Sequence, residues 1–209
     1  MARPKLGTHK IPTVERILEA AERAFGTLGR ERATLADIAA EAGIRRPSLL
    51  YHFETKDALY EAVIRRVFDA LKNALVEEMK PGPFEEQVSN LSNAFLRFIE
   101  SRPAFGPLIL RDVIDGKGPS HDILSNEIEP PLALVEDWLI TESKGQLSPE
   151  FPIRAALLQL CASSMLFSAA GQLQQTLWNG DSEMHWLSQQ LFLGTFTNKS
   201  QIVCSGDER

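Results

Sequence analysis

Cysteine and long apolar runs are both scarce in this sequence. Its 209 residues include only 2 cysteines, which are too few for a disulfide framework and lack metal-ligand spacing. No apolar run reaches the roughly 18 residues that a membrane span requires, since glutamines and serines interrupt the longest candidate, 155–173. The first twelve residues carry charge without an apolar segment, so they do not resemble a signal peptide. We therefore expect a cytoplasmic protein that has no membrane contact.

The sequence also lacks the alternating apolar pattern of β-strands, internal repeats and low-complexity tracts. Apolar residues instead recur at helical spacing along the chain. This pattern predicts an all-α fold with helices at about 13–28, 34–42, 46–53, 55–80, 84–101, 103–114, 121–129, 132–143, 153–177 and 181–193. Pro130 and Pro131 predict a kink or a fresh start before the segment 132–143, because an interior proline removes a helical hydrogen bond.

Charge is divided unevenly between the two ends of the chain, although its net value is −6. Residues 1–60 hold 10 Lys and Arg against 8 Asp and Glu, whereas the rest holds 12 against 20. The front is therefore mildly basic and the remainder is acidic. This division favours an N-terminal region that meets phosphates and an acidic body that stays soluble.

The segment 33–59 carries the most informative pattern. Thr34 can cap a short helix, with Asp37 three residues on, and Gly43 follows where the chain must turn with positive φ. A second short helix then begins at Arg45-Arg46-Pro47, since proline is tolerated in a first helical turn. Two short helices around a glycine turn, the second beginning with cations, are typical of a helix-turn-helix that enters the DNA major groove. The pattern indicates a transcription factor.

These residues resemble the TetR family of bacterial repressors. The resemblance rests on Thr34, on the turn 39–44 (AAEAGI), on 51–53 (YHF) and on 56–59 (KDAL), and it covers roughly residues 11–62. Two positions depart from the family pattern: Arg45 replaces a frequent serine cap, and Leu50 replaces the first of two aromatic residues. We interpret these departures as an altered operator preference, with DNA binding retained.

The resemblance implies a three-helix DNA-binding domain in residues 1–57 and a helical ligand-sensing and dimerisation domain in residues 58–209. It further implies a homodimeric repressor that a small, largely apolar ligand releases from a palindromic operator. Two recognition helices would then meet successive major grooves about 34 Å apart. No cofactor is expected.

Arginines 45 and 46 are the candidates for reading DNA bases. Arg46 can make two parallel hydrogen bonds to a guanine edge, and Arg45 can do the same or bind a phosphate. The alternative is a solvated surface pair. The resemblance also places Pro47 and Ser48 toward the groove, where the ring can meet a thymine methyl and the hydroxyl a phosphate or base. Alternatively, Pro47 only starts the helix and Ser48 is an exposed polar residue.

Four further side chains are candidates for phosphate contacts. Tyr51 and His52 resemble the family's backbone clamps, although Tyr51 packing on the core and a solvated His52 remain alternatives. Lys56 begins the long helix, where its charge and the backbone N–H groups can meet a phosphate. Thr34 is first a cap and second a phosphate contact. The N-terminal arm either reaches the minor groove or only solubilises the chain; its basic residues are Arg3, Lys5, His9 and Lys10.

The segment 153–177 is rich in small residues, which allow two helices to approach closely. Together with the last helix it predicts a four-helix bundle across a two-fold axis, with an intrachain core helix as the alternative. The candidate dimer residues are Leu158, Ala162, Met165, Ala169, Trp186, Leu187 and Leu191. Aromatic and apolar residues elsewhere are candidates for a ligand cavity, although aromatic stripes at helical spacing more often belong to an ordinary core. They are Phe95, Phe98, Phe105, Leu108, Leu134, Trp138 and Phe167, with Gln159 and Ser164 as polar anchors.

Two other classes of function are alternatives to a transcription factor. An enzyme is disfavoured because the sequence has no Gly-rich phosphate loop, nucleophile elbow or Glu-x-x-His pair. The four histidines are scattered, and His52 has no second His or Cys at coordinating spacing, so no metal site is expected. The third class is a protein-binding adaptor that keeps the helix-turn-helix scaffold without binding an operator. The presence of Arg45, Arg46 and Lys56 favours DNA binding over that alternative.

Overall fold

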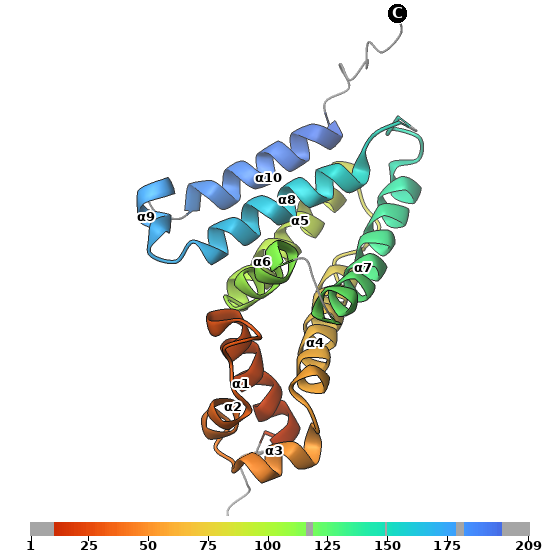
Figure 1. Ribbon diagram of the computed structural model, residues 1–209. Helices are drawn as coiled ribbons and strands as arrows, with labels where there is room; N and C mark the ends of the chain where they lie inside the picture. Colours follow the sequence, from red (N-terminus) through yellow and green to blue (C-terminus); the bar gives the residue numbers. More distant parts are fainter. Residues whose placement is uncertain (1–10, 116–118, 149, 179–181, 198–209) are drawn as a thin grey trace, which may run out of the picture. The chain divides into compact units, whose positions relative to one another are not determined.

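The computed structural model describes residues 11–115, 119–148, 150–178 and 182–197, and these form α-helices without a β-strand (Figure 1). The predicted all-α fold is confirmed. The helices are α1 (Thr13–Leu28), α2 (Leu35–Glu41), α3 (Arg46–His52), α4 (Lys56–Val76), α5 (Phe84–Ser101), α6 (Phe105–Asp115), α7 (Pro119–Ser143), α8 (Ile153–Ala169), α9 (Leu173–Trp178) and α10 (Ser182–Thr197). None of them, within the described segments, is both long and apolar enough to cross a membrane.

The chain divides into two compact units. Unit 1 comprises Met1–Ala70 and Arg102–Ile128, and unit 2 comprises Leu71–Ser101 and Glu129–Arg209. Unit 1 therefore holds α1, α2, α3, α6 and most of α4, while unit 2 holds α5, α8, α9 and α10. This division describes packing. The predicted boundary between a DNA-binding domain, residues 1–57, and a ligand-sensing domain, residues 58–209, concerns function and stays a prediction.

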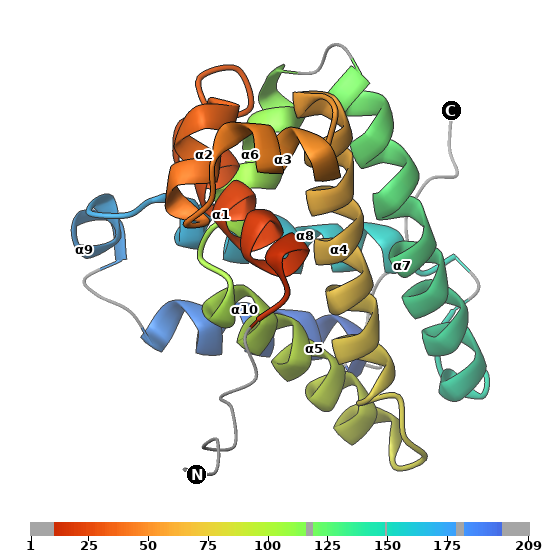
Figure 2. The same cartoon turned by 90° about the horizontal axis from the view of Figure 1, so that it is seen from below.

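The first three helices form as the sequence predicts. Thr34 caps α2 by accepting a hydrogen bond from the Asp37 backbone N–H at 3.1 Å, which satisfies one of the donors that a helix start leaves unpaired. Gly43 takes φ +68° in the turn before α3, a conformation that glycine adopts without strain. Helix α2 packs on both α1 and α3 (Figure 2). These contacts fix the direction in which α3 presents its surface.

Aromatic packing joins α1, α4 and α6 in unit 1. The fully buried Tyr60 ring meets Phe25 edge-on at 5.2 Å between centroids, and Phe68 meets Phe105 in the same way at 5.9 Å. Gly26 allows α1 to approach the start of α6 closely, because a Cβ there would lie 2.7 Å from the carbonyl oxygen of Ala104. The helix-turn-helix thus packs on a buried, largely apolar interior to which α6 contributes.

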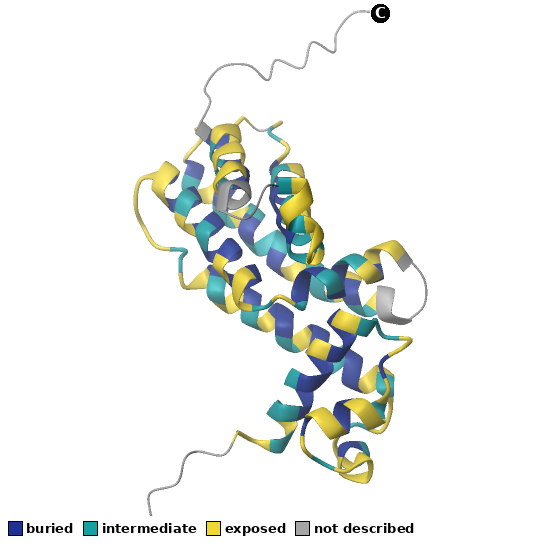
Figure 3. Ribbon diagram, turned by 90° about the vertical axis from the view of Figure 1, so that its left-hand side faces the viewer, coloured by how far each residue is buried: buried dark blue, intermediate teal, exposed yellow. Residues whose placement is uncertain are grey.

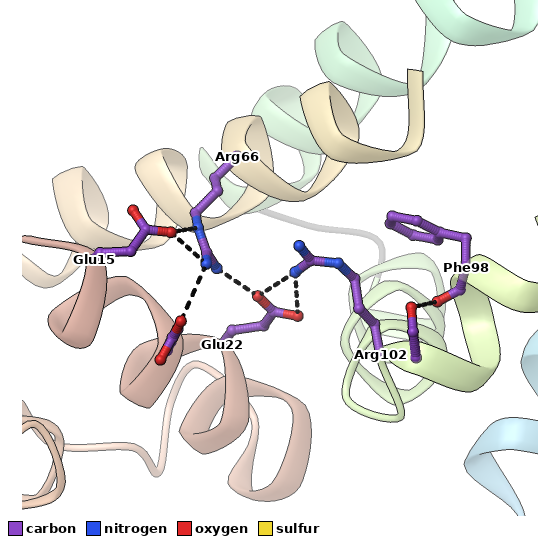
Figure 4. Close-up of polar contacts among 7 residues, drawn as sticks. Glu15, Glu22, Arg66, Phe98 and Arg102 are labelled. Atoms are coloured by element: carbon purple, nitrogen blue, oxygen red, sulfur yellow. Dashed lines mark hydrogen bonds and ion pairs between the residues drawn. The ribbon is translucent and has the colours of Figure 1, made fainter. Parts of the chain in front are cut away.

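A buried carboxylate adds an ionic contact to this interior. Arg66 of α4 donates to Glu22 of α1 at 2.9 Å, and Arg102 donates to the same carboxylate at 3.0 and 3.1 Å (Figure 4). Glu15 also accepts from Arg66, at 2.8 Å. The carboxylate of Glu22 therefore ties α1 to α4 and to the residues just before α6. We call Glu22, Arg66 and Arg102 the Glu22 network.

Unit 2 is built from α5, α8 and α10, each of which packs on the other two. In Figure 3 the buried residues form stripes along these helices, with exposed residues on the opposite faces. Phe196 lies at the centre of an aromatic group, with ring centroids 4.9 Å from Phe192, 5.1 Å from Phe151 and 6.4 Å from Phe84. Burial of Phe84, Phe192 and Phe196 contributes to the hydrophobic stabilisation of unit 2.

Two predicted helix boundaries are wrong. Helix α7 continues through Pro130 and Pro131, so the fresh start that was one of the two expectations there does not occur, while the kink stays a prediction. The two missing bonds would have ended on the carbonyls of Asn126 and Glu127, whose exposed or half-buried positions let water replace the lost donors. The predicted helix 153–177 is interrupted instead, because Gly171 takes φ +52° and separates α8 from α9.

Candidate nucleic-acid interface

Helix α3 is anchored by one face and exposed on the rest. Leu49 is fully buried and its carbonyl accepts from the Phe53 N–H at 2.9 Å, which ends the helix. At the other end, the Arg45 carbonyl accepts from the Ser48 N–H at 2.9 Å, although no side chain caps the helix. The anchored face fixes the orientation of α3 and leaves its first turn in water.

The predicted base-reading residues all lie on this exposed surface. Arg45, Arg46, Pro47 and Ser48 are consecutive and exposed. Within the described part of the chain, neither arginine has a carboxylate partner. A guanidinium that is exposed and unneutralised remains available to an external acceptor such as a guanine edge or a phosphate. We call this four-residue surface the α3 tip.

Tyr51 and His52 continue the same surface toward the end of α3. The side chain of Tyr51 is 86% exposed, and its ring meets that of His52 edge-on at 5.3 Å. These two rings, together with Pro47 and Ser48, line an open hollow whose other members are Thr13 of α1 and Ile44. An aromatic ring so exposed contributes little to the core, so the alternative in which Tyr51 packs on it does not hold.

Two of the predicted phosphate contacts also have structural partners. The Thr34 hydroxyl donates to the Asp37 carboxylate at 2.5 Å while it caps α2, and the residue remains exposed. Lys56 donates through Nζ to the carbonyls of Glu31 at 3.1 Å and Ala33 at 3.4 Å. Since an ammonium has three donors, one remains for a phosphate. The predicted arm residues Arg3, Lys5, His9 and Lys10 lie outside the described residues.

Behind this surface, two polar contacts involve α4: one joins it to α6 and the other to the loop between α1 and α2. The Tyr60 hydroxyl donates to Asp112 of α6, and burial with this bond raises the pKa of Tyr60 above its ordinary value. Arg30 pairs with Asp57 at the start of α4. Burial alone would lower the pKa of Arg30, but the hydrogen bond and charge of Asp57 outweigh it and raise that pKa. These contacts stabilise the base of the helix-turn-helix.

The predicted ligand-pocket residues do not all belong to one unit. Phe105 and Leu108 are buried in unit 1. In unit 2, Phe95, Phe98, Ser164 and Phe167 are buried, whereas Leu134 and Trp138 are half-buried. Ser164 already donates to the Leu160 carbonyl at 2.9 Å. Gln159 requires a correction: it lies on the exposed face of α8, so its amide is not an anchor inside unit 2.

The predicted dimer residues share an exposed apolar surface on α8 and α10. Trp186 and Leu191 are each 61% exposed, and Leu158, Ala162, Ala169 and Leu187 are also exposed, with Met165 half-buried. The prediction omitted three exposed leucines, Leu166, Leu173 and Leu177, of which the last two belong to the separate helix α9. Gln159 lies on the same side of α8 as Leu158 and Ala162. We call these apolar residues the α8–α10 face: Leu158, Ala162, Met165, Leu166, Ala169, Leu173, Leu177, Trp186, Leu187 and Leu191.

A helix-turn-helix whose second helix, α3, begins at two exposed arginines without carboxylate partners among the described residues is typical of DNA-binding proteins, and known proteins share this region. Residues 17–63 match the model of the bacterial regulatory proteins of the tetR family. The helix-turn-helix region of this chain is therefore similar to that of the tetR family.

The curated relatives that match are transcriptional regulators. The chain is 36% identical over 62 residues to IcaR, the HTH-type negative transcriptional regulator of the biofilm operon icaADBC in Staphylococcus aureus strain Newman. That match covers 30% of this chain and 33% of IcaR, so the chain spans about a third of the relative's length. It is 29% identical over 143 residues to the HTH-type transcriptional regulator RutR of Escherichia coli K12, covering 65% of each chain.

Solved structures share the fold over almost the whole chain. The fatty acid degradation regulator FadR from Bacillus halodurans superposes with a TM-score of 0.72, at 16% identity, covering 90% of this chain and 97% of that one. FadR from Bacillus subtilis in complex with stearoyl-CoA also has a TM-score of 0.72, at 11% identity, covering 87% and 97%. These identities are low, so the similarity concerns the fold.

Proposed function

We propose that this protein is a sequence-specific DNA-binding regulator of transcription that acts as a homodimer. The observation that carries the proposal is the α3 tip, where Arg45 and Arg46 are exposed and, in the part of the chain that the structure describes, lack a carboxylate partner, on a helix anchored by Leu49. Arg46, in the first helical turn, reads a guanine edge in the major groove, while Arg45 binds a base or a phosphate. Tyr51, His52, Lys56 and Thr34 bind the flanking phosphates.

The α8–α10 face supports the homodimer. Several large apolar side chains of α8 and α10 are exposed, and water contact with Trp186, Leu187 and Leu191 is unfavourable unless a partner covers them. A second copy would cover the same surface on both partners through a two-fold axis, as is usual in homodimers. Two copies of α3 then contact successive major grooves, which makes the operator palindromic.

We further propose that a small, largely apolar ligand releases the repressor from its operator. The buried aromatic side chains of unit 2, including Phe95, Phe98 and Phe167, supply an apolar interior. FadR from Bacillus subtilis holds stearoyl-CoA, a ligand with a long apolar chain, which is a precedent for such a ligand in this fold. By linkage, an inducing ligand binds the DNA-incompetent form more tightly than the DNA-bound form.

The competing function is a helical adaptor that does not bind an operator. The two are separated by selecting binding sites for the full chain from random duplex DNA and titrating the selected duplex. The double variant Arg45→Ala/Arg46→Ala should lose about 1–3 kcal/mol for each base contact, which is about 5- to 140-fold in affinity per contact. The matched control is Arg23→Ala/Arg65→Ala, which removes the same charge from arginines that have carboxylate partners. Failure to select any sequence, or equal affinities for both double variants, would reject the proposal.

A further inference from the structure

A third arginine, Arg16 of α1, lies beside the helix-turn-helix turn. Its Nη1 would be 3.5 Å from a Cβ placed on Gly43, so the guanidinium packs against the turn that immediately precedes Ile44 and Arg45. Thr13, one helical turn earlier on the same side of α1, lines the open hollow with Ser48 and the aromatic rings of α3. Arg16 therefore borders the surface that the proposed function turns toward DNA.

The charge of Arg16 is not neutralised within the described residues. Its acidic neighbours on α1 face another way, since Glu15, Glu19 and Glu22 all lie within ion-pair distance of Arg66 on α4. Arg23, two turns further along α1, is paired with Glu41 at 2.6 Å. Helix α1 thus has an acidic side that meets α4 and a cationic residue beside the turn.

The environment of Arg16 also favours an external anion. Its Nε is buried and has no hydrogen-bond partner among the described residues. A buried donor without an acceptor destabilises the chain, and a guanidinium removed from part of its water gains more from an anion than a fully hydrated one. Of the described arginines in unit 1, those without a hydrogen-bond or ion-pair partner are Arg16, Arg32, Arg45 and Arg46.

We propose that Arg16 is a phosphate-binding residue, which contacts the DNA backbone next to the groove that α3 enters. This inference rests on the proposed function and adds to it a residue outside α3 and outside the helix-turn-helix motif. A phosphate contact fixes the position of the protein on the duplex and carries no sequence information. Arg16 thereby helps to set the register in which the α3 tip meets base edges.

The test is a salt titration of binding to the selected operator duplex and to a scrambled duplex of the same length. Arg16→Gln should lower affinity for both duplexes by the same factor and reduce the slope of log K against log salt by about 1 for each bound chain. Arg16→Lys keeps the charge and should retain the wild-type slope. Arg23→Gln is the matched control, because it removes the same charge from the same helix at a paired site, and it should leave the slope unchanged.

A purely structural role for Arg16 gives a different result. In that case Arg16→Gln would unfold at lower urea concentration than the wild type, yet its salt slope would equal that of the wild type, and the inference would be overturned. If Arg16→Gln loses helical circular dichroism, Arg16→Met, which keeps the apolar stem, replaces it in the same titration. If the wild-type chain binds neither duplex, the proposed function itself fails, which is a separate outcome.

Discussion

Replacement of Glu22 by glutamine removes the one carboxylate on which two arginines of the Glu22 network converge. The side chain of Glu22 is only 9% exposed, whereas Arg66 is 20% and Arg102 25% exposed. Glutamine preserves the size of the side chain but not its charge, so both guanidinium groups lose a charge-assisted hydrogen bond. We therefore expect Glu22→Gln to destabilise unit 1.

The magnitude follows from burial and from the contacts that remain. Removing one partner of a fully buried ion pair costs about 3–5 kcal/mol. The two arginines here reach water in part, and Arg66 keeps Glu15, so we expect a loss of about 2–3 kcal/mol in the free energy of unfolding. With a urea m-value of about 2 kcal/mol per M, the unfolding midpoint should fall by about 1 M.

The assay is urea unfolding followed by far-ultraviolet circular dichroism, with hydrogen exchange of α1 amides as the local readout. All 3 tryptophans lie in unit 2, so their fluorescence reports that unit separately. The control is Glu41→Gln, which breaks the Arg23 pair where both side chains are well exposed and should cost about 0.2–1 kcal/mol. A Glu22→Gln loss no larger than that of the control would show that the network does not stabilise α1.

Two further predictions concern the α8–α10 face and the buried hydroxyl. Leu191→Glu should convert the dimer to a monomer in sedimentation experiments, because it places a charge on the apolar face. The control is Gln190→Glu, which adds the same charge at the neighbouring exposed polar position and should leave the dimer intact. A monomeric wild type would contradict the dimer. Tyr60 has a raised pKa, so its contribution to stability is present below the unfolded pKa of about 10 and declines above it. Between pH 10 and 11, wild-type stability should fall more steeply than that of Tyr60→Phe, by up to about 1.4 kcal/mol per pH unit. An equal fall in stability with pH in the wild type and in Tyr60→Phe would contradict the raised pKa of Tyr60.

The helix-turn-helix was predictable because its signals are local. Thr34 caps α2, Gly43 supplies a positive φ and Pro47 begins α3, and each of these requirements can be recognised within a few residues. The sequence also indicated that α8 is rich in small residues and that α10 carries Trp186, Leu187 and Leu191; these side chains of α10 are exposed, and their role in a dimer stays a prediction. The extension of the α8–α10 face to Leu173 was missed, because Gly171 was taken as a helix residue.

Contacts between distant residues could not be predicted. Glu22 meets Arg66 and Arg102 across 44 and 80 residues of sequence, and no periodicity indicates such a partnership. The position of Arg16 beside Gly43 is of the same kind, because it depends on how α1 packs on α2. Gln159 was misplaced for a related reason: spacing shows which residues share a helix face but not whether that face is covered.

Methylation interference on the selected operator tests major-groove reading by the α3 tip most directly. Methylation of guanine N7 blocks an arginine that binds that edge in the major groove. We predict interference at guanines in two half-sites about 34 Å apart, and its loss at those guanines when Arg46 is replaced by alanine. Interference confined to adenines of the minor groove, or an unchanged guanine pattern in both Arg45→Ala and Arg46→Ala, would contradict the account.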